Sequence, residues 1–495
     1  MKVELMEYDA IGLGEMVREG EVKPSELVEM TIERIERVNP KLNAVIHKMY
    51  DEAHKIAKKW DKEISSGRRT DAIFSGVPFL LKDLIAEYEG APLNEGSGVV
   101  KGYISKFDSE LVKRQKNAGL IIIGKTNTPE FGCLPTTEPI IYGPTTNPWN
   151  PDIISGGSSG GSAVAVAAGI VPMAHGNDGG GSIRIPASCC GVFGMKPTRA
   201  RNPLGPLLGD FGSGVVVEHA LTRTVRDSAA LLDVTSGPDI GDPYYAPPKK
   251  RPFLEEVEKE VGRLNIGFLT SIPNGWSFGP KIHPECEKAV RDAAKLSESL
   301  GHNVDEINAE ELSYTNLFMH FGIIFASTTG HMFTYWEKEL GKKITEDQVE
   351  LMTWLFYQNA MTRTGAEYLS AIEECQRFSR KVARWFHKGG YDILLTPTLT
   401  IPPPKIGSFS PESSTKVGKT IQLMNNLVAF TFVYNATGQP AMSVPLYWTA
   451  DNIPIGIQFA ARFGDEATLF RLAAQLEQER PWVDRKPPIH YSKSF

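Results

Sequence analysis

The sequence predicts an α/β fold, because short apolar runs with the character of buried strands alternate along the chain with longer helical patterns. Residues 77–81 and the β-branched run at 120–123 each follow a glycine and have the length and composition of core strands. Residues 24–38 carry apolar side chains at helical spacing, and 49–66 form a second, more charged helical pattern. A chain of 495 residues, of which 41% are hydrophobic, can bury a substantial core.

The first predicted helix, at 24–38, has signals at both ends. Pro24 and Ser25 supply the start. Asn39 and Pro40 should end it, because proline lacks the backbone N–H that a continuing helix needs. The other predicted elements are helices at 49–66, 108–118 and 162–170, a connector at 237–252, a mostly helical stretch at 253–380 that contains a strand at 264–269, a strand at 393–395, strand-like runs within 440–461, and a closing helix at 465–479.

Charge and cysteine content narrow the range of partners and cofactors. A net charge of −6 is too mild to indicate a nucleic-acid-binding surface. The five cysteines are scattered without CxxC or CxxH spacing, so we expect no zinc site, and nothing indicates another metal or a cofactor. Reduced thiols fit a cytoplasmic enzyme, and the N-terminal residues lack the layout of a signal peptide. No apolar run is long enough to predict a membrane span.

Two glycine- and serine-rich segments and one lysine carry the chemistry. The segments are 155–162 (SGGSSGGS) and 176–184 (GNDGGGSIR), and Lys82 lies upstream, at the end of the strand predicted at 77–81. Together they supply a hydroxyl nucleophile, a base, and backbone N–H groups that are free of side-chain bulk and can stabilise an oxyanion. The segments adjoin apolar stretches that should pack, which argues against a flexible linker. The pattern therefore favours acyl transfer.

Other interpretations of these motifs are weaker. Residues 119–126 match the G-x-x-x-x-G-K-T pattern of a phosphate-binding loop, but the four central residues are the predicted strand rather than a turn. Residues 157–161 match the G-x-S-x-G pattern of a nucleophile elbow, but no convincing strand precedes them, and no later histidine carries a recognisable local signal. His175 is interpreted as a structural histidine that donates to a nearby carbonyl, rather than as a proton-transfer group.

The same segments resemble the signature of the amidase signature family. The matching stretches are 156–163, 178–187, 124–130, 194–198 and 438–441. The resemblance implies that family's fold, a central mixed and twisted β-sheet covered on both sides by helices. Within it we expect an N-terminal helical region, 1–66, packed on an α/β domain, 67–495, with a mostly helical insertion around 275–385 that shapes the substrate pocket.

The resemblance also implies the roles of the site residues. Ser182 is the expected nucleophile, Ser158 a bridging serine held by a cis peptide bond, and Lys82 the base. The remaining expected site residues are the oxyanion-hole residues Gly179, Gly180 and Gly181, joined by the N–H of Ser182, and the supporting residues Ser159, Asp178 and Arg184. Asp178 and Arg184 should brace the nucleophile loop rather than react.

The expected base imposes a physical condition on its surroundings. A lysine accepts a proton only when it is neutral, and burial lowers its pKa because the ammonium form loses hydration. Phe79, Leu80 and Leu81 directly precede Lys82 and are the expected apolar walls. The chain departs from many family members in having Asn177 where Thr is common, and Gly179 where Thr, Ile or Ala is common. Neither departure removes a catalytic side chain.

The resemblance implies an amidase that forms an acyl-enzyme on small linear or cyclic amides. Residues 136–139, 147–150, 174–178 and 345–350 resemble family members that act on 6-aminohexanoate-type oligomers. We expect a small-molecule amide as the ligand and no binding to nucleic acid or membranes. Whether the protein forms a homodimer is left open by the sequence. The expected pocket lies within 310–440, with candidate lining residues Phe321, Phe325, Tyr357, Met424 and Asn425.

Three alternative functions stay open at this point. The glutaminase subunit of a tRNA-dependent amidotransferase has the same family fold, but such subunits usually have Gln after the Arg of the nucleophile motif, where this chain has Ile185. A catalytically inactive binding protein conflicts with the presence of all three catalytic side chains. Hydrolysis of allophanate is a further activity within the same chemistry.

Overall fold

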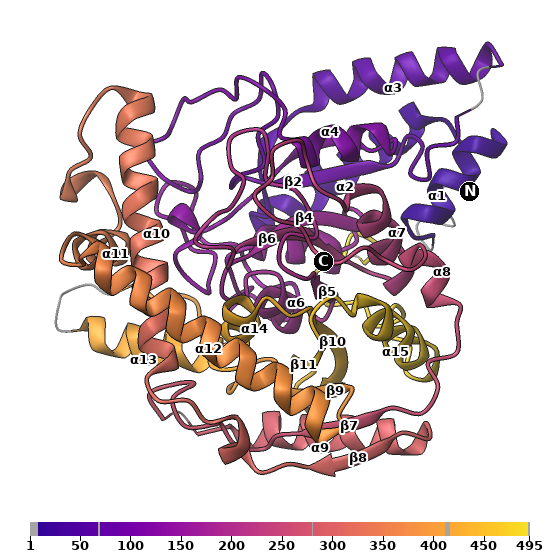
Figure 1. The fold of residues 1–495 in the computed structure, drawn as a ribbon. Coiled ribbons are helices and arrows are strands. Elements are labelled where there is room, and N and C mark those ends of the chain that lie inside the picture. The colour runs from indigo at the N-terminus through magenta and orange to yellow at the C-terminus, as the bar shows by residue number, and fades with distance from the viewer. Residues whose placement is uncertain (1–7, 68–69, 280, 411–415, 494–495) are drawn as a thin grey trace.

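The computed structural model of the chain describes residues 8–67, 70–279, 281–410 and 416–493 (Figure 1). It confirms the predicted α/β fold, with one mixed sheet of 11 strands. The strands are β1 (Val45–Lys48), β2 (Pro78–Lys82), β3 (Ile121–Thr126), β4 (Met173–Asp178), β5 (Phe193–Lys196), β6 (Val217–Thr222), β7 (Asn265–Phe268), β8 (Asn303–Glu306), β9 (Ile393–Pro397), β10 (Ala441–Trp448) and β11 (Pro454–Ala461).

The helices surround this sheet. They are α1 (Ala10–Glu19), α2 (Pro24–Leu42), α3 (Tyr50–Ser65), α4 (Glu110–Asn117), α5 (Gly160–Ala167), α6 (Arg184–Cys190), α7 (Val225–Thr235), α8 (Phe253–Val257), α9 (Pro284–Ser299), α10 (Leu317–Leu340), α11 (Leu351–Met361), α12 (Gly365–Gly389), α13 (Val417–Val428), α14 (Phe432–Thr437) and α15 (Glu466–Glu479), with 3-10 turns η2 (Glu130–Gly132), η3 (Ala309–Leu312) and η4 (Glu346–Gln348). In Figure 1, α10 to α13 lie on one side of the view and α7, α8 and α15 on the other.

The strand order is β1-β3-β2-β4-β6-β5-β10-β11-β9-β7-β8. β2 pairs in parallel with β3 and β4, and β7 pairs in parallel with β8 and β9. The other neighbouring pairs are antiparallel. Because the carboxyl ends of parallel strands lie at the same edge of a sheet, Lys82 at the end of β2 comes close to the last residues of β4.

Both faces of the sheet are buried. Side chains alternate between the faces along a strand, so Leu80 packs with Ala163 of α5 and Ala187 of α6, whereas Phe79 and Leu81 pack in the cluster that includes α1, α4 and α7. All three side chains before Lys82 are fully buried, as expected for apolar walls.

The predicted end of the first helix is wrong. α2 continues through Pro40 to Leu42. Pro40 falls in the last turn, where a missing N–H removes only one hydrogen bond of the helix. Beyond the helix end, the side-chain oxygen of Asn39 accepts the N–H groups of Ala44 and Val45 at 2.9 and 2.8 Å. The helix predicted at 162–170 also moved: it begins at Gly160 and ends at Ala167.

Several strands had no recognisable signal in the sequence. The most important of them is β4, because it leads into the nucleophile loop. It includes the first three residues of the second glycine-rich segment, 176–178, which read as a loop in the sequence. The segment has no β-branched run, and its extended form is fixed by antiparallel pairing with β6 along its whole length. The other unpredicted strands are β1, β5, β6 and β8.

The first 66 residues contribute more than helices. Besides α1, α2 and α3 they supply β1, which extends the sheet by antiparallel pairing with β3. Within the described ranges, no helix is both long enough and apolar enough to cross a membrane.

A close contact between α5 and the sheet predicts a stability effect. A Cβ added at Gly161 would lie 2.4 Å from the backbone N of Asn127 and 2.7 Å from the backbone O of Ala44, and backbone atoms cannot turn aside. We therefore expect Gly161→Ala to lower the free energy of unfolding by about 1–3 kcal/mol, measured by urea denaturation.

Gly365→Ala is the matched control. Gly365 opens α12, and an added Cβ there meets nothing within 4 Å. Its substitution should leave stability unchanged or raise it by up to about 1 kcal/mol. Equal effects of the two substitutions would contradict the close approach of α5.

Candidate active site

Lys82 is completely buried at the carboxyl end of β2. Its Nζ lies 2.6 Å from Ser158 Oγ and 2.5 Å from Asn177 Oδ1. Burial lowers the pKa of Lys82 to about 7, against the opposing effect of the negative charges on Asp178 and Glu218. A substantial fraction of the amine is therefore neutral at neutral pH.

Ser158 lies in the first glycine-rich segment, two residues before the start of α5. The Gly157–Ser158 peptide bond is cis, and the Ser158 side chain is buried beside Lys82. Ser159 follows it at the N-terminus of α5, where its backbone N–H donates to the carbonyl of Ser182 at 3.2 Å. The Ser159 hydroxyl donates to the carbonyl of Asn177 at 3.3 Å. These bonds hold the first segment against the second.

Ser182 is partly exposed, and it opens onto a cavity of about 240 Å³. Ser158, Gly179 and Gly180 line the same cavity. Ser158 and Ser182 thus line one cavity, and the buried amine of Lys82 contacts Ser158.

The backbone N–H groups of the nucleophile loop divide into two sets. Gly181 donates its N–H to Asp178 Oδ1 at 2.8 Å, so this group is already occupied. The N–H groups of Gly179, Gly180 and Ser182 meet no acceptor among the described residues. Of the expected oxyanion donors, these three N–H groups are available to a ligand. The N–H of Gly181 is not available, because it donates to Asp178.

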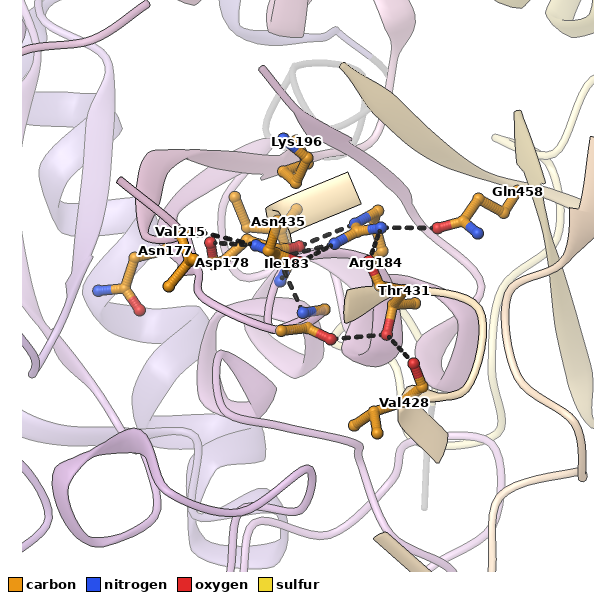
Figure 2. Close-up of polar contacts among 12 residues, drawn as sticks. Asn177, Asp178, Ile183, Arg184, Lys196, Val215, Val428, Thr431, Asn435 and Gln458 are labelled. Atoms are coloured by element: carbon orange, nitrogen blue, oxygen red, sulfur yellow. Dashed lines mark hydrogen bonds and ion pairs between the residues drawn. The ribbon is translucent and has the colours of Figure 1, made fainter. Parts of the chain in front are cut away.

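A buried ion pair supports the loop from behind (Figure 2). Arg184 donates to both carboxylate oxygens of Asp178, at 3.0 and 2.9 Å, and neither side chain is exposed. Burial alone would raise the pKa of Asp178, but the charge and hydrogen bonds of Arg184 hold it at about 2. Asp178 also accepts the N–H of Ile183 at 3.2 Å. These contacts tie the nucleophile loop to the ion pair.

Two residues far along the chain complete this support, and sequence reasoning missed both. Asn435 donates to the carbonyl of Asp178 and to its carboxylate, at 2.8 and 2.9 Å, and accepts from Arg184 at 2.8 Å. Thr431 donates its hydroxyl to the carbonyl of Gly180 at 2.6 Å (Figure 2). The only local signal is their position just before the 438–441 block.

Asn177 is a further contact that its sequence position did not reveal. Its amide nitrogen donates to the carbonyl of Leu84 at 3.1 Å, which fixes the amide so that its oxygen faces Lys82. The residue noted as a departure from the family pattern is thus a direct partner of the buried amine.

His175 is buried, as a structural histidine should be, but its partner is not the expected carbonyl. Its Nδ1 accepts the backbone N–H of Lys82 at 3.2 Å, and its Nε2 lies 3.2 Å from Glu218 Oε1. A ring that accepts at Nδ1 carries its proton at Nε2. His175 therefore contacts the backbone of Lys82 on one side and lies close to Glu218 on the other, without completing a hydrogen bond to it.

The cavity beside Ser182 is strongly apolar. None of the described residues that line it carries a charged side chain. Of the five candidate lining residues, Phe321, Phe325 and Met424 do line it. Tyr357 instead stacks on Phe333, with ring centroids 4.3 Å apart, and Asn425 is buried with its side-chain oxygen accepting the N–H of Phe278.

The competing motif interpretations do not fit the geometry. Residues 121–126 are a fully buried strand rather than a phosphate-binding turn. The segment before 157–161 contains no strand, and the Ser159 hydroxyl is buried and bonded to a carbonyl, unlike the nucleophile of an elbow. Among the described residues, no group of three or more His, Cys, Asp or Glu side chains is arranged to hold a metal ion.

Comparison with known proteins agrees with this geometry. Residues 26–470 match the family described as Amidase. The 6-aminohexanoate-cyclic-dimer hydrolase of Paenarthrobacter ureafaciens is 40% identical over 99% of this chain and 98% of its own length. A solved structure of 6-aminohexanoate cyclic dimer hydrolase superposes with a TM-score of 0.91 at 38% identity, covering 98% of this chain and 99% of that one. A bacterial aryl acylamidase structure gives 0.88 at 27% identity, covering 99% of both chains. The chain therefore belongs to the amidase family.

Proposed function

We propose that this protein hydrolyses amide bonds through an acyl-enzyme, with Ser182 as nucleophile, Ser158 as proton relay and Lys82 as base. The observation that carries the proposal is the buried Lys82 amine, 2.6 Å from the Ser158 hydroxyl and with a pKa lowered by burial to about 7. A serine hydroxyl is a poor nucleophile at neutral pH and needs such a base.

In the proposed first step, neutral Lys82 takes the hydroxyl proton of Ser158, and Ser158 takes that of Ser182. The oxygen of Ser182 attacks the amide carbonyl. The proton then returns through Ser158 to the leaving nitrogen, so the amine departs neutral and an ester to Ser182 stays behind. Water attacks this ester by the same proton path, which releases the acid and restores all three side chains.

The negative charge that forms on the carbonyl oxygen needs donors already in place. We assign this role to the N–H groups of Gly179, Gly180 and Ser182, because Gly181 donates to Asp178. Asp178, Arg184 and Ser159 act as supporting residues that fix the loop carrying these donors. Loss of one oxyanion donor typically costs about 100- to 1000-fold in rate.

The cavity favours uncharged amides with apolar substituents. Phe131, Phe321 and Phe325 line it, and no charged side chain is present among its described lining residues to receive a charged substrate group. The names of the relatives are consistent with this: a cyclic dimer of 6-aminohexanoate and aryl acylamides. We propose small uncharged amides, linear or cyclic, as substrates; among 6-aminohexanoate-type oligomers the cyclic forms fit best, because they lack the free ammonium and carboxylate of the linear ones.

The glutaminase alternative is less favoured by the same cavity. Free glutamine carries an ammonium and a carboxylate next to its side chain, and both would lose hydration here without a partner. We also propose a reducing compartment such as the cytoplasm, because all five cysteines are buried free thiols.

The first test of the nucleophile is Ser182→Ala. Turnover of a small neutral amide should fall by at least about a thousandfold, because the reacting oxygen is gone. The melting temperature should change little, since Ser182 lies at the cavity surface. A fluorophosphonate probe, located by mass spectrometry, should label position 182 of the wild type, and labelling of another serine in active protein would refute the assignment.

The second test is the pH dependence of kcat/KM. Because only neutral Lys82 can accept a proton and its pKa is about 7, activity should rise with pH, reach half its maximum near pH 7 and level off above it. Lys82→Met should lose about 100- to 10,000-fold in rate, and its residual activity should lack this rise. An optimum near pH 5 is incompatible with the proposed base.

The third test is Asp178→Asn. It leaves the Arg184 charge buried without its carboxylate, so we expect a loss of about 3–5 kcal/mol in the free energy of unfolding. It also removes a negative charge that raises the pKa of Lys82, so the acid limb of the surviving activity should move to lower pH.

Glu466→Gln is the matched control for that test. Glu466 forms a comparable buried pair with Arg201, with contacts of 2.9 Å at both carboxylate oxygens. It should cost similar stability without moving the acid limb. An equal shift of the limb in both variants would contradict the electrostatic coupling between Asp178 and Lys82.

A further inference from the structure

A second cavity adjoins the one beside Ser182. It has a volume of about 80 Å³ and shares the lining residues Ile85, Phe211 and Met332 with the first cavity. The two cavities therefore lie on either side of these three side chains. The proposed hydrolysis does not use the second cavity.

Two carboxyl groups lie at the buried side of this cavity. Glu87 and Glu95 both line it, and they are only 6% and 5% exposed. Glu95 Oε2 accepts the indole N–H of Trp336 at 2.8 Å, and Glu87 Oε1 accepts the hydroxyl of Tyr103 at 3.4 Å. Within the described residues, Glu87 Oε2 completes no hydrogen bond of good geometry, and the nearby hydroxyl of Ser105 lowers the pKa of Glu87 without completing one.

The charge around these groups is unbalanced. The nearest buried cation, Lys125, is shared among three carboxyl groups: it lies 3.7 Å from Asp83 Oδ1, and its charge also acts on Glu87 and Glu95. No lysine or arginine is among the described residues that line the cavity. Burial raises the pKa of Glu95 to about 7 and also raises that of Glu87. Because Lys125 is shared among three carboxyl groups, an added cation would further stabilise the ionised forms of Glu87 and Glu95.

The walls indicate what kind of cation fits. Leu207 and His331 are exposed and mark the solvent side of the cavity, whereas the carboxyl groups are buried. Between them the lining is apolar and aromatic, and includes Phe107, Tyr335 and Trp336. Aromatic faces attract ammonium groups, and an apolar wall favours an alkyl chain over the water shell of an inorganic ion.

We propose that this second cavity binds a primary alkylammonium ion, with the ammonium at Glu87 and Glu95 and the alkyl chain toward Leu207. During turnover this cavity would hold the amine that amide hydrolysis releases, and that role rests on the proposed function. The binding of an alkylammonium ion does not rest on it. The site is separate from the reacting groups, because its carboxylates lie beyond the wall formed by Ile85, Phe211 and Met332.

Titration calorimetry with n-butylammonium chloride on the intact protein tests the site. Butylammonium should bind, and 1-butanol, its neutral counterpart, should bind at least about tenfold more weakly. Glu87→Gln and Glu95→Gln, made separately, should each weaken butylammonium binding by about tenfold or more. Glu339→Gln is the control, since Glu339 pairs with Lys106 at 2.8 Å on the surface and lines neither cavity. It should leave the affinity within about twofold.

Several results would overturn the inference. They are no binding of butylammonium, equal binding of 1-butanol, or undiminished affinity in a folded glutamine variant. The comparison with 1-butanol uses wild-type protein and stands even where a variant fails to fold. Because calorimetry needs no turnover, a failure here leaves the proposed hydrolysis intact, and a protein that binds butylammonium but cleaves no amide would refute only the hydrolysis.

Discussion

The site depends on one constraint, a lysine amine buried with neutral partners only. Lys82 contacts the hydroxyl of Ser158 and the amide oxygen of Asn177, and no carboxylate touches it. Neutral oxygens can hydrogen bond to either protonation state of the amine, whereas a carboxylate in contact would favour the ammonium form. Removal from water then decides the balance, and it favours the neutral amine that proton transfer requires. Burial and hydrogen bonding thus act together on Lys82. Burial keeps its amine uncharged, and the hydrogen bonds orient the lone pair of the amine nitrogen.

The fold also has to keep the nearest carboxylates from acting as partners of that amine. Asp178 and Glu218 both raise the pKa of Lys82, yet neither contacts its amine. Asp178 is held by Arg184 in a two-point ion pair, and Glu218 lies 3.2 Å from His175 Nε2. Because Asp178 also accepts two N–H groups of the nucleophile loop, the same ion pair shapes the loop and restrains the charge near the base. The conformation of the nucleophile loop and the pKa of Lys82 are therefore coupled through Asp178.

Features that depend on local sequence patterns could be predicted from the sequence. The proposed catalytic side chains stand in short motifs, and the strands and helices with strong periodicity were found where expected. Contacts that depend on tertiary structure were not predictable. Asn435 and Thr431 reach the loop from about 250 residues away, at distances in sequence where no spacing rule applies. β4 is extended because β6 pairs with it, not because of its own residues. Pro40 is tolerated inside α2 because it falls in the last turn, where its missing N–H removes only one hydrogen bond of the helix.

The same electrostatic constraint explains why the acidic cavity and the reacting groups are kept apart. A carboxylate placed in the cavity beside Ser182 would stabilise a charged Lys82 and remove the base, so that cavity has to stay free of charge. A group able to hold an ammonium ion must then lie elsewhere, separated from the amine by apolar side chains. Ile85, Phe211 and Met332 stand between the two cavities and provide that separation. Division into a neutral reacting cavity and an acidic neighbour is thus a consequence of using an uncharged lysine as the base.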